Sequence, residues 1–286
     1  MVEMWIAEAM VKFAAGEALG QIFDQNNASN LDNVKRWIDE AVGEIKKFVS
    51  EELKKQLDDQ YVNELQTGIY AVVLDLIRYD SHKPHDRKIL DLRMPGVIDL
   101  RSATQRRRFA GVTLYADVVG LELLIYTAFV KNHNDKGYKA LIDSLITTAA
   151  GHISECLSES TAWEKAGTES VVIHPIWHGC PPKAYGGRYS WRGGEEFLCS
   201  DDYQTIEGWQ ATKAAQRVAM FQDEWRLVVS EVHNPLRAAI EEWIKGQSAV
   251  TGKPKQLVGE LVGSVIGPHD WLGSSLQPPQ FVALRS

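Results

Sequence analysis

The chain has 286 residues and a net charge of −7, from 31 basic and 38 acidic side chains. Hydrophobic residues make up 44% and charged residues 24%, which is ordinary globular usage and excludes a disordered chain, a collagen and a coiled-coil rod. The acidic balance, with an isoelectric point near 5.7, argues against nucleic acid as a partner.

The cysteine content limits the covalent chemistry of the chain. Cys156, Cys180 and Cys199 are too few, and odd in number, for a secreted disulfide scaffold. One bridge at most can form; Cys180 with Cys199 is the obvious pair, and separate thiols are the alternative. Residues 1–20 lack a basic n-region, so no signal peptide is recognised. We expect synthesis in the cytoplasm, with later release if the target is a membrane.

Apolar residues recur at the helical period over the first part of the chain. A first amphipathic helix is predicted near residues 5–13, and a longer apolar stripe occupies residues 31–57. The next stripe, residues 62–77, either continues that helix or follows a bend near Tyr61. Two prolines then bracket a shorter predicted element at residues 86–93.

The most apolar part of the chain is residues 112–130, where 14 of 19 residues are hydrophobic. It belongs to a helix predicted from Ser102 to Lys131. A helix that is apolar on every side belongs at the centre of a bundle. Four amphipathic stripes are expected to surround it: residues 31–57, 62–77, 138–157 and 206–232.

The composition changes after residue 160, where Gly, Pro and Trp become frequent. Short strand-like runs and the Gly193-Gly194 pair predict a β-hairpin. Helix returns near Tyr203 and is expected to break or kink at Asn234-Pro235. The predicted fold is mainly α, a helical bundle of six to seven helices around a central apolar helix with a small β-containing insertion. The predicted segments are the bundle (1–160), the insertion (161–203), returning helices (204–247) and a Gly/Pro-rich C-terminal tail (248–286).

The central helix is balanced between water and membrane. Its ten strongly apolar residues contribute roughly −3 to −6 kcal/mol to insertion, and Asp117 and Glu122 each cost roughly 2.5 to 3.5 kcal/mol when ionised at the bilayer centre. In a bundle these carboxylates would pair with basic side chains, and in a pore they would face water or be neutralised. Acidic pH or Glu122→Gln should therefore favour insertion, and Leu121→Arg should oppose it.

Four segments carry a family resemblance. They read EAVGEIKKFVSEELKKQLDDQYVNELQTGIYAVVLDLIRY (40–79), LRMPGVIDL (92–100), TLYADVVGLELLIYTAF (113–129) and YKALIDSLITTAAGHISECLSESTAWEKAG (138–167). Their order resembles the N-terminal helical domain of the insecticidal crystal delta-endotoxins. Tyr115-Ala116 match the start of the family's central helix, and Tyr138 and Cys156 match the two ends of the helix after it.

The resemblance covers less than half of the chain, about residues 41–167, and leaves no room for the family's two β-rich domains. It implies a bacterial, pore-forming helical domain in which a hairpin containing the central helix enters the membrane. Partners implied are membrane lipid or a membrane receptor, with an oligomer formed on the membrane.

A basic cluster directly precedes the central helix. Arg106, Arg107 and Arg108 could hold anionic lipid headgroups. The alternative is a solvated helix end. No wider basic field supports binding to nucleic acid.

The insertion contains the one weak metal candidate, His174, His178, Cys180 and Cys199. These ligand types suit zinc, although the spacing fits no standard finger. Two unlinked thiols or one disulfide are the competing interpretations.

Aromatic side chains gather in the same insertion, among them Trp177, Tyr185, Tyr189 and Trp191. If exposed, they would form a binding platform for sugar, lipid or protein. If buried, they form a small core under a long loop.

The leading functional prediction is a membrane-active, toxin-like protein without catalysis or cofactor. The first alternative is a soluble binding protein that uses the aromatic insertion. The second is an enzyme or metal protein with a site near His174, His178 and Cys180. The chain contains no Walker A sequence, no G-x-S-x-G, no H-E-x-x-H and no Rossmann glycine fingerprint.

Overall fold

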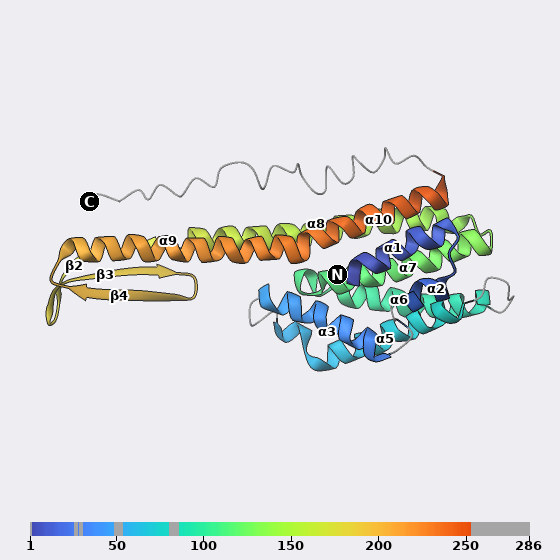
Figure 1. Ribbon diagram of the computed structural model, residues 1–286, viewed down its shortest axis with the longest axis horizontal. Helices are drawn as coiled ribbons and strands as arrows, with labels where there is room; N and C mark the ends of the chain where they lie inside the picture. The colour runs from blue at the N-terminus through green and yellow to red at the C-terminus, as the bar shows by residue number, and fades with distance from the viewer. Residues whose placement is uncertain (1, 26–27, 29–30, 49–53, 80–85, 253–286) are drawn as a thin grey trace.

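A computed structural model describes the chain except residues 1, 26–27, 29–30, 49–53, 80–85 and 253–286. Figure 1 shows a helical bundle at one end of an elongated molecule. Two antiparallel helices, α8 and α9, leave the bundle together, and a small sheet lies along the far part of α9. We call the projecting part of α8, α9 and the sheet the arm.

The bundle is built mostly from the N-terminal half of the chain. Its elements are α1 (Val2–Ala15), α2 (Leu19–Gln25), α3 (Leu31–Phe48), the 3₁₀ turn η1 (Lys55–Leu57), α5 (Asp59–Arg78), α6 (Asp86–Gln105), the 3₁₀ turn η2 (Arg108–Gly111) and α7 (Val112–Asn132). A bend separates the second and third predicted stripes. Asp58 has an extended backbone there, and its carboxylate accepts a hydrogen bond from the Tyr61 backbone N–H (2.8 Å), which caps α5.

The C-terminal half supplies the arm and closes the bundle. Its elements are α8 (Gly137–Glu169), β1 (Val172–Ile173), β2 (Trp177–Cys180), β3 (Lys183–Trp191), β4 (Gly194–Ser200), α9 (Tyr203–Val228), a π-helical turn (Val229–His233) and α10 (Asn234–Thr251). Asp202 caps α9 by accepting hydrogen bonds from the backbone N–H groups of Gln204 and Thr205. The mainly α fold with a small antiparallel sheet is as predicted.

The central apolar helix is α7, and residues 112–129 are all buried. It packs mainly against α1, α6 and α8, with further contacts to α10, α3 and α5. The prediction that this helix is the core is confirmed. The prediction that the 206–232 stripe surrounds it is wrong, because α9 packs instead on α8 and on β3 of the sheet.

Three predicted boundaries are also wrong. The helix predicted to start at Ser102 is divided, because α6 ends at Gln105 and α7 begins at Val112. The element at 86–93 does not stop at Pro95, since α6 runs through it to Gln105. Proline has no N–H, so the carbonyl of Asp91 lacks its helical hydrogen-bond partner. Pro95 is exposed, and water can therefore reach that carbonyl and bond to it instead. Helix α8 continues past residue 160 to Glu169, which makes the β-containing part shorter than the predicted insertion.

The sheet is antiparallel, with β3 at its centre. Strand β4 pairs along one edge of β3, with Gly187 opposite Leu198, and β1 and β2 pair with β3 as well. The predicted hairpin is present: Gly193 in the β3–β4 turn adopts φ +115°, which glycine tolerates. Gly187 contacts Ile206 of α9, where any side chain would collide, so the sheet lies close against that helix.

The chain stays helical from α9 into α10, so of the predicted break or kink at Asn234-Pro235 the break is absent. The π turn precedes Pro235, which sits in the first turn of α10, where a proline needs no helical N–H partner. Helix α10 ends at Gly252 with a left-handed φ of +74°. The predicted tail, 248–286, is helical to Thr251, and residues 253–286 lie outside the described part of the chain.

Candidate functional site

Helix α7 is long and apolar enough to cross a membrane. The most apolar 18-residue stretch within Arg108–Asn132 is entirely buried in the bundle. It is the one such helix among the described residues. The core helix of a soluble protein meets the same criterion, so the polar groups within α7 are the more informative feature.

Glu122 is the most buried acidic group on α7, with its side chain 1% exposed. Arg101 of α6 donates a charge-assisted hydrogen bond from Nε to Glu122 Oε2 (2.7 Å), and the Tyr126 hydroxyl donates to Oε1 (2.6 Å). Burial and the bond to Glu122 raise the pKa of Tyr126. The predicted pairing of this carboxylate inside the bundle is therefore present, with its partner on the preceding helix.

A second polar line runs along α7 at helical spacing. Thr113, Asp117, Gly120 and Thr127 recur at intervals of three, four and seven, so they share one face. Asp117 is 2% exposed, and a Cβ at Gly120 would lie 3.6 Å from Cβ of Ile6 on α1. Within the described residues the hydroxyls of Thr113 and Thr127 have no hydrogen-bond partner. This face therefore carries buried polarity toward α1.

Leu121 lies between these polar groups and is fully buried. Burial also raises the pKa of Tyr115, near the start of α7, to about 12. The predicted insertion residues on α7 are thus all enclosed by the bundle, and none is more than 2% exposed in this conformation.

The three arginines do not form one basic patch. They lie in the turn between α6 and α7, directly before the central helix as predicted, and they interrupt the helix predicted from Ser102 to Lys131. The Arg107 guanidinium lies over the Tyr61 ring at 4.3 Å, while Arg108, with a positive φ of 50°, pairs with Glu159 of α8. Arg106 is exposed. Two of the three are therefore committed to contacts within the bundle.

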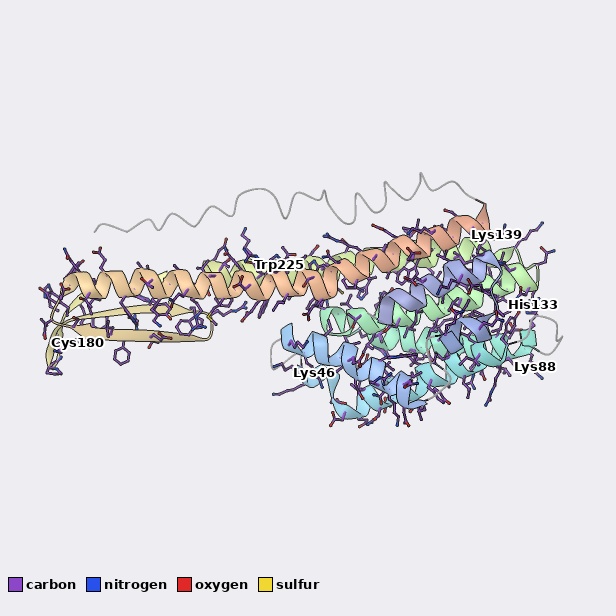
Figure 2. The ribbon with its side chains drawn as sticks, viewed as in Figure 1. Lys46, Lys88, His133, Lys139, Cys180 and Trp225 are labelled. Carbon is purple, nitrogen blue, oxygen red and sulfur yellow. A yellow bond between two sulfur atoms is a disulfide. The ribbon has the colours of Figure 1, made fainter. Side chains whose placement is uncertain are left out.

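The cysteines of the sheet are joined. Cys180 and Cys199 form a disulfide at the far end of the arm (Figure 2), and Cys156 is a buried free cysteine. Burial raises the pKa of the Cys156 thiol to about 12, so it is protonated and a poor nucleophile.

The histidines of the weak metal candidate do not converge with the sulfur atoms. His174 Nε2 lies 2.7 Å from the Ser190 hydroxyl, and His178 packs against Tyr185. The disulfide leaves no thiolate for zinc, and the described residues contain no group of three metal-ligating side chains.

The predicted aromatic platform is divided between the two faces of the sheet. Tyr189 is buried against Trp209 of α9 and stacks on Trp191, over which Arg217 lies at 3.9 Å. Tyr185 contacts Tyr203. These residues form a small core between sheet and helix, which was the alternative interpretation.

The opposite face of the sheet is where apolar side chains are exposed. Trp177 covers Gly186 and is 38% exposed, and Phe197, opposite Arg188 in the pairing, is 69% exposed. Val172 adds to this face. Phe197 was not predicted, although its place in the alternating pattern of β4 puts it on the face opposite Leu198.

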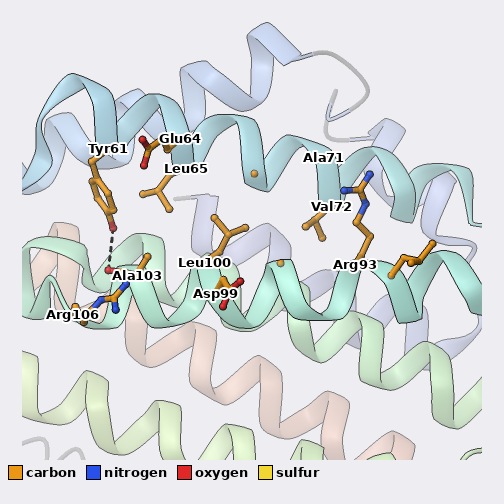
Figure 3. A pocket seen from close by; sticks show the side chains of 13 residues that line it. Tyr61, Glu64, Leu65, Ala71, Val72, Arg93, Asp99, Leu100, Ala103 and Arg106 are labelled. Atoms are coloured by element: carbon orange, nitrogen blue, oxygen red, sulfur yellow. Dashed lines mark hydrogen bonds between the residues drawn. The ribbon is translucent and has the colours of Figure 1, made fainter.

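A groove between α5 and α6 was also missed (Figure 3). It has a volume of about 430 Å³, with an apolar floor that includes Leu65, Val72 and Leu100 and charged side chains such as Arg93 and Asp99 at its rim. Gly68 contacts Leu100, and Gly96 faces open space. Small residues at both helices were the sequence signal that could have indicated it.

The comparisons with known proteins gave no relative: no family model, no curated protein and no solved structure matches this chain.

Proposed function

We propose that the protein acts on membranes as a non-catalytic, toxin-like, pore-forming helical protein whose central helix, α7, leaves the bundle to enter the bilayer. The observation that carries the proposal is the combination of apolar length and organised polarity in α7. Its 21 residues span about 31 Å at 1.5 Å per residue, close to the roughly 30 Å of a hydrocarbon core.

The polar groups of α7 support a role in a pore. Thr113, Asp117 and Thr127 lie on one face, which could line a water-filled lumen while the apolar remainder faces lipid or neighbouring helices. Polar side chains on this face do not stabilise a water-free protein core, because each buried hydroxyl without a hydrogen-bond partner costs roughly 1–3 kcal/mol of stability.

The Arg101–Glu122 pair supports insertion as a hairpin of α6 and α7. Because the two side chains lie on consecutive helices joined by a tight turn, the pair can remain formed while both helices move. Glu122 would then enter the bilayer already neutralised, which lowers the cost expected for an ionised carboxylate. This arrangement agrees with what the resemblance to the delta-endotoxins implies, including lipid or a membrane receptor as partner.

The test is to attach α7 to α1 by a reversible bond. The Cβ separation of 3.6 Å between positions 6 and 120 is within the range that a disulfide requires. In the double variant Ile6→Cys, Gly120→Cys, the oxidised protein should release no dye from liposomes, and reductant should restore release. The bond prevents α7 from separating from the bundle, whereas the folded structure is kept.

Three controls make the experiment decisive. Wild-type protein with and without reductant measures any effect of opening Cys180–Cys199, and Ile6→Cys alone measures the effect of the substitution. Circular dichroism verifies folding. Equal dye release from the oxidised and reduced double variant contradicts the proposal, as does wild-type protein that permeabilises neither liposomes across pH nor any tested cell.

A second candidate is a soluble binding protein that uses the outer face of the sheet. The observation in its favour is the exposure of Phe197, Trp177 and Val172 together on one face. Phe197→Ser should then abolish binding to an array of glycans or to liposomes, while Met220→Ser, at another exposed apolar residue on α9, should not. Binding that survives in the oxidised α1–α7 variant but fails in Phe197→Ser would favour this function over pore formation.

A further inference from the structure

The returning helix changes its winding where the arm meets the bundle. Residues Val229–His233 form a π turn between α9 and α10, and Trp225, just before it, lies midway along the molecule in Figure 2. A π turn within a long helix places one extra residue in the turn and often marks a functional position. Here it directs the His233 side chain toward α8.

His233 joins the two long helices at this junction. It is 4% exposed, and its Nε2 lies 2.9 Å from the hydroxyl oxygen of Ser160 on α8. The Ser160 hydroxyl also donates to the carbonyl of Leu157 (2.8 Å), so it accepts its second bond from His233 Nε2–H. The Trp225 ring meets the imidazole edge-on, with centroids 4.9 Å apart.

The charges around this imidazole disfavour a second positive charge. Burial lowers the pKa of His233 to about 4, and the positive charge of Arg237 on α10, one turn away, adds to this effect. Glu231 of the π turn pairs with Lys47 of α3 (3.7 Å), and Glu159 of α8 pairs with Arg108. From α8 the contact to the imidazole is the neutral Ser160 hydroxyl.

The direction of the pH effect follows from these contacts. An unfolded histidine titrates near 6.5, while the folded pKa is depressed. Neutral His233 therefore contributes its full stabilisation above about pH 6.5, and this contribution is lost as the pH falls through about 4. The added proton binds at Nδ1, so the Nε2–H bond to Ser160 persists, and the new charge in a buried site is what destabilises the junction. Protonation would place an imidazolium beside Arg237 in a closed site.

We propose that Ser160, His233 and Trp225 form an acid-released latch that holds α8 and the returning helix together where the arm leaves the bundle. At neutral pH the latch fixes the arm. In acid the π turn opens while the bundle around α7 stays folded. This inference concerns the protein in solution and does not rest on the proposed function.

Hydrogen exchange at pH 7 and pH 4, corrected for intrinsic rates, tests the latch. In the wild type, amides of residues 225–240 should lose protection by about tenfold or more at pH 4, while those of α7 change little. His233→Gln keeps a donor for Ser160 but carries no titrating group, so its loss of protection should be under about twofold. His152→Gln, at the half-buried histidine of α8, should behave like wild type.

Each other outcome overturns the latch. A wild type without the loss at 225–240, an equal loss in His233→Gln, or a simultaneous loss across α7 would each do so. If His233→Gln fails to fold, Ser160→Ala decides: it should already lower protection of 225–240 at pH 7 and show a smaller further loss at pH 4. An unchanged Ser160→Ala profile rejects the proposal.

Discussion

The Arg101–Glu122–Tyr126 network shows how a single ion pair can decide the energetics of a core helix. Glu122 is almost entirely enclosed, whereas Arg101 is 21% exposed. A buried carboxylate with its cation and a hydroxyl donor is tolerated, but the same carboxylate alone is strongly unfavourable. The network therefore makes α6 and α7 energetically dependent on one another.

Arg101→Met should lower the free energy of unfolding by about 3–5 kcal/mol, because it leaves Glu122 buried without its cation. The double variant Arg101→Met, Glu122→Gln should recover most of that loss. Urea unfolding followed by circular dichroism measures both.

Arg87→Met is the matched control. It removes a pair with Asp135 in which both partners are about one-third exposed or more, so the loss should stay below about 1 kcal/mol. Equal losses in Arg87→Met and Arg101→Met would show that burial of Glu122 has no special cost.

At the scale of elements, the crossing of α1 and α7 depends on Gly120. Any Cβ there would meet the Ile6 side chain, and Trp243 of α10 is nearby. A glycine in the middle of a helix lowers its stability, so the residue is retained for close packing and not for helix formation.

Gly120→Val should lower stability by about 1–3 kcal/mol through overpacking against Ile6. Gly151→Ala on α8, where a Cβ meets nothing within 4 Å, should raise stability by about 0.5–1 kcal/mol. Thermal unfolding of the two variants beside wild type measures the opposite signs, and a neutral Gly120→Val would mean that α1 does not pack closely on α7.

The sequence pattern predicted that α7 is the buried central helix, but it did not predict all of the elements that pack around it. All-round apolarity is a property of the helix alone, and it is visible in residues 112–130. An apolar stripe such as that of α9 shows only that something covers it. Here the cover is β3 and α8, because Gly187 lets the sheet lie against Ile206.

The length of α8 was underestimated for a related reason. Beyond Ser160 the helix lies in the arm and contacts few partners, so it does not need a broad apolar stripe, and exposed residues such as Trp163 and Lys165 interrupt the pattern. Pro95 and Asn234-Pro235 predict helix boundaries because prolines usually end helices. Exposure of one and the π turn before the other removed the conflict.

For the candidate site, the carboxylates of α7 and a basic partner could be predicted, but the identity of Arg101 could not. It lies between the element predicted at 86–93 and the helix predicted from Ser102, and its contact with Glu122 depends on how α6 crosses α7. The latch residues Ser160 and His233 are 73 positions apart in the chain, so no local pattern connects them.

At the scale of the whole molecule, the disulfide stabilises the sheet at the end farthest from the bundle. It closes a loop with a sequence separation of 19, for which chain entropy gives about 3 kcal/mol. The sheet is small, and among the described helices α9 is the one that contacts it extensively. The contribution of the disulfide is therefore large for the sheet and small for the bundle.

Unreduced protein should therefore show no reactive thiol when folded and one, Cys156, in denaturant. The variant Cys180→Ser, Cys199→Ser should keep its helical circular dichroism but lose amide protection at residues 183–200. Three thiols in denaturant without reductant would contradict the bridge, and full protection of the sheet in the double variant would contradict its stabilising role.

The long helices of the arm also amplify motion. Helix α9 has 26 residues and so extends about 39 Å from the π turn to the far end of the arm, with the sheet lying along its distal part. A rotation of about 10° at that turn would displace the far end of the arm by about 7 Å. The exposed face with Phe197 and Trp177 would then move by up to that distance while the bundle stays still. A change of a few ångströms beside His233 thus becomes a displacement of the sheet large enough to measure between two labels.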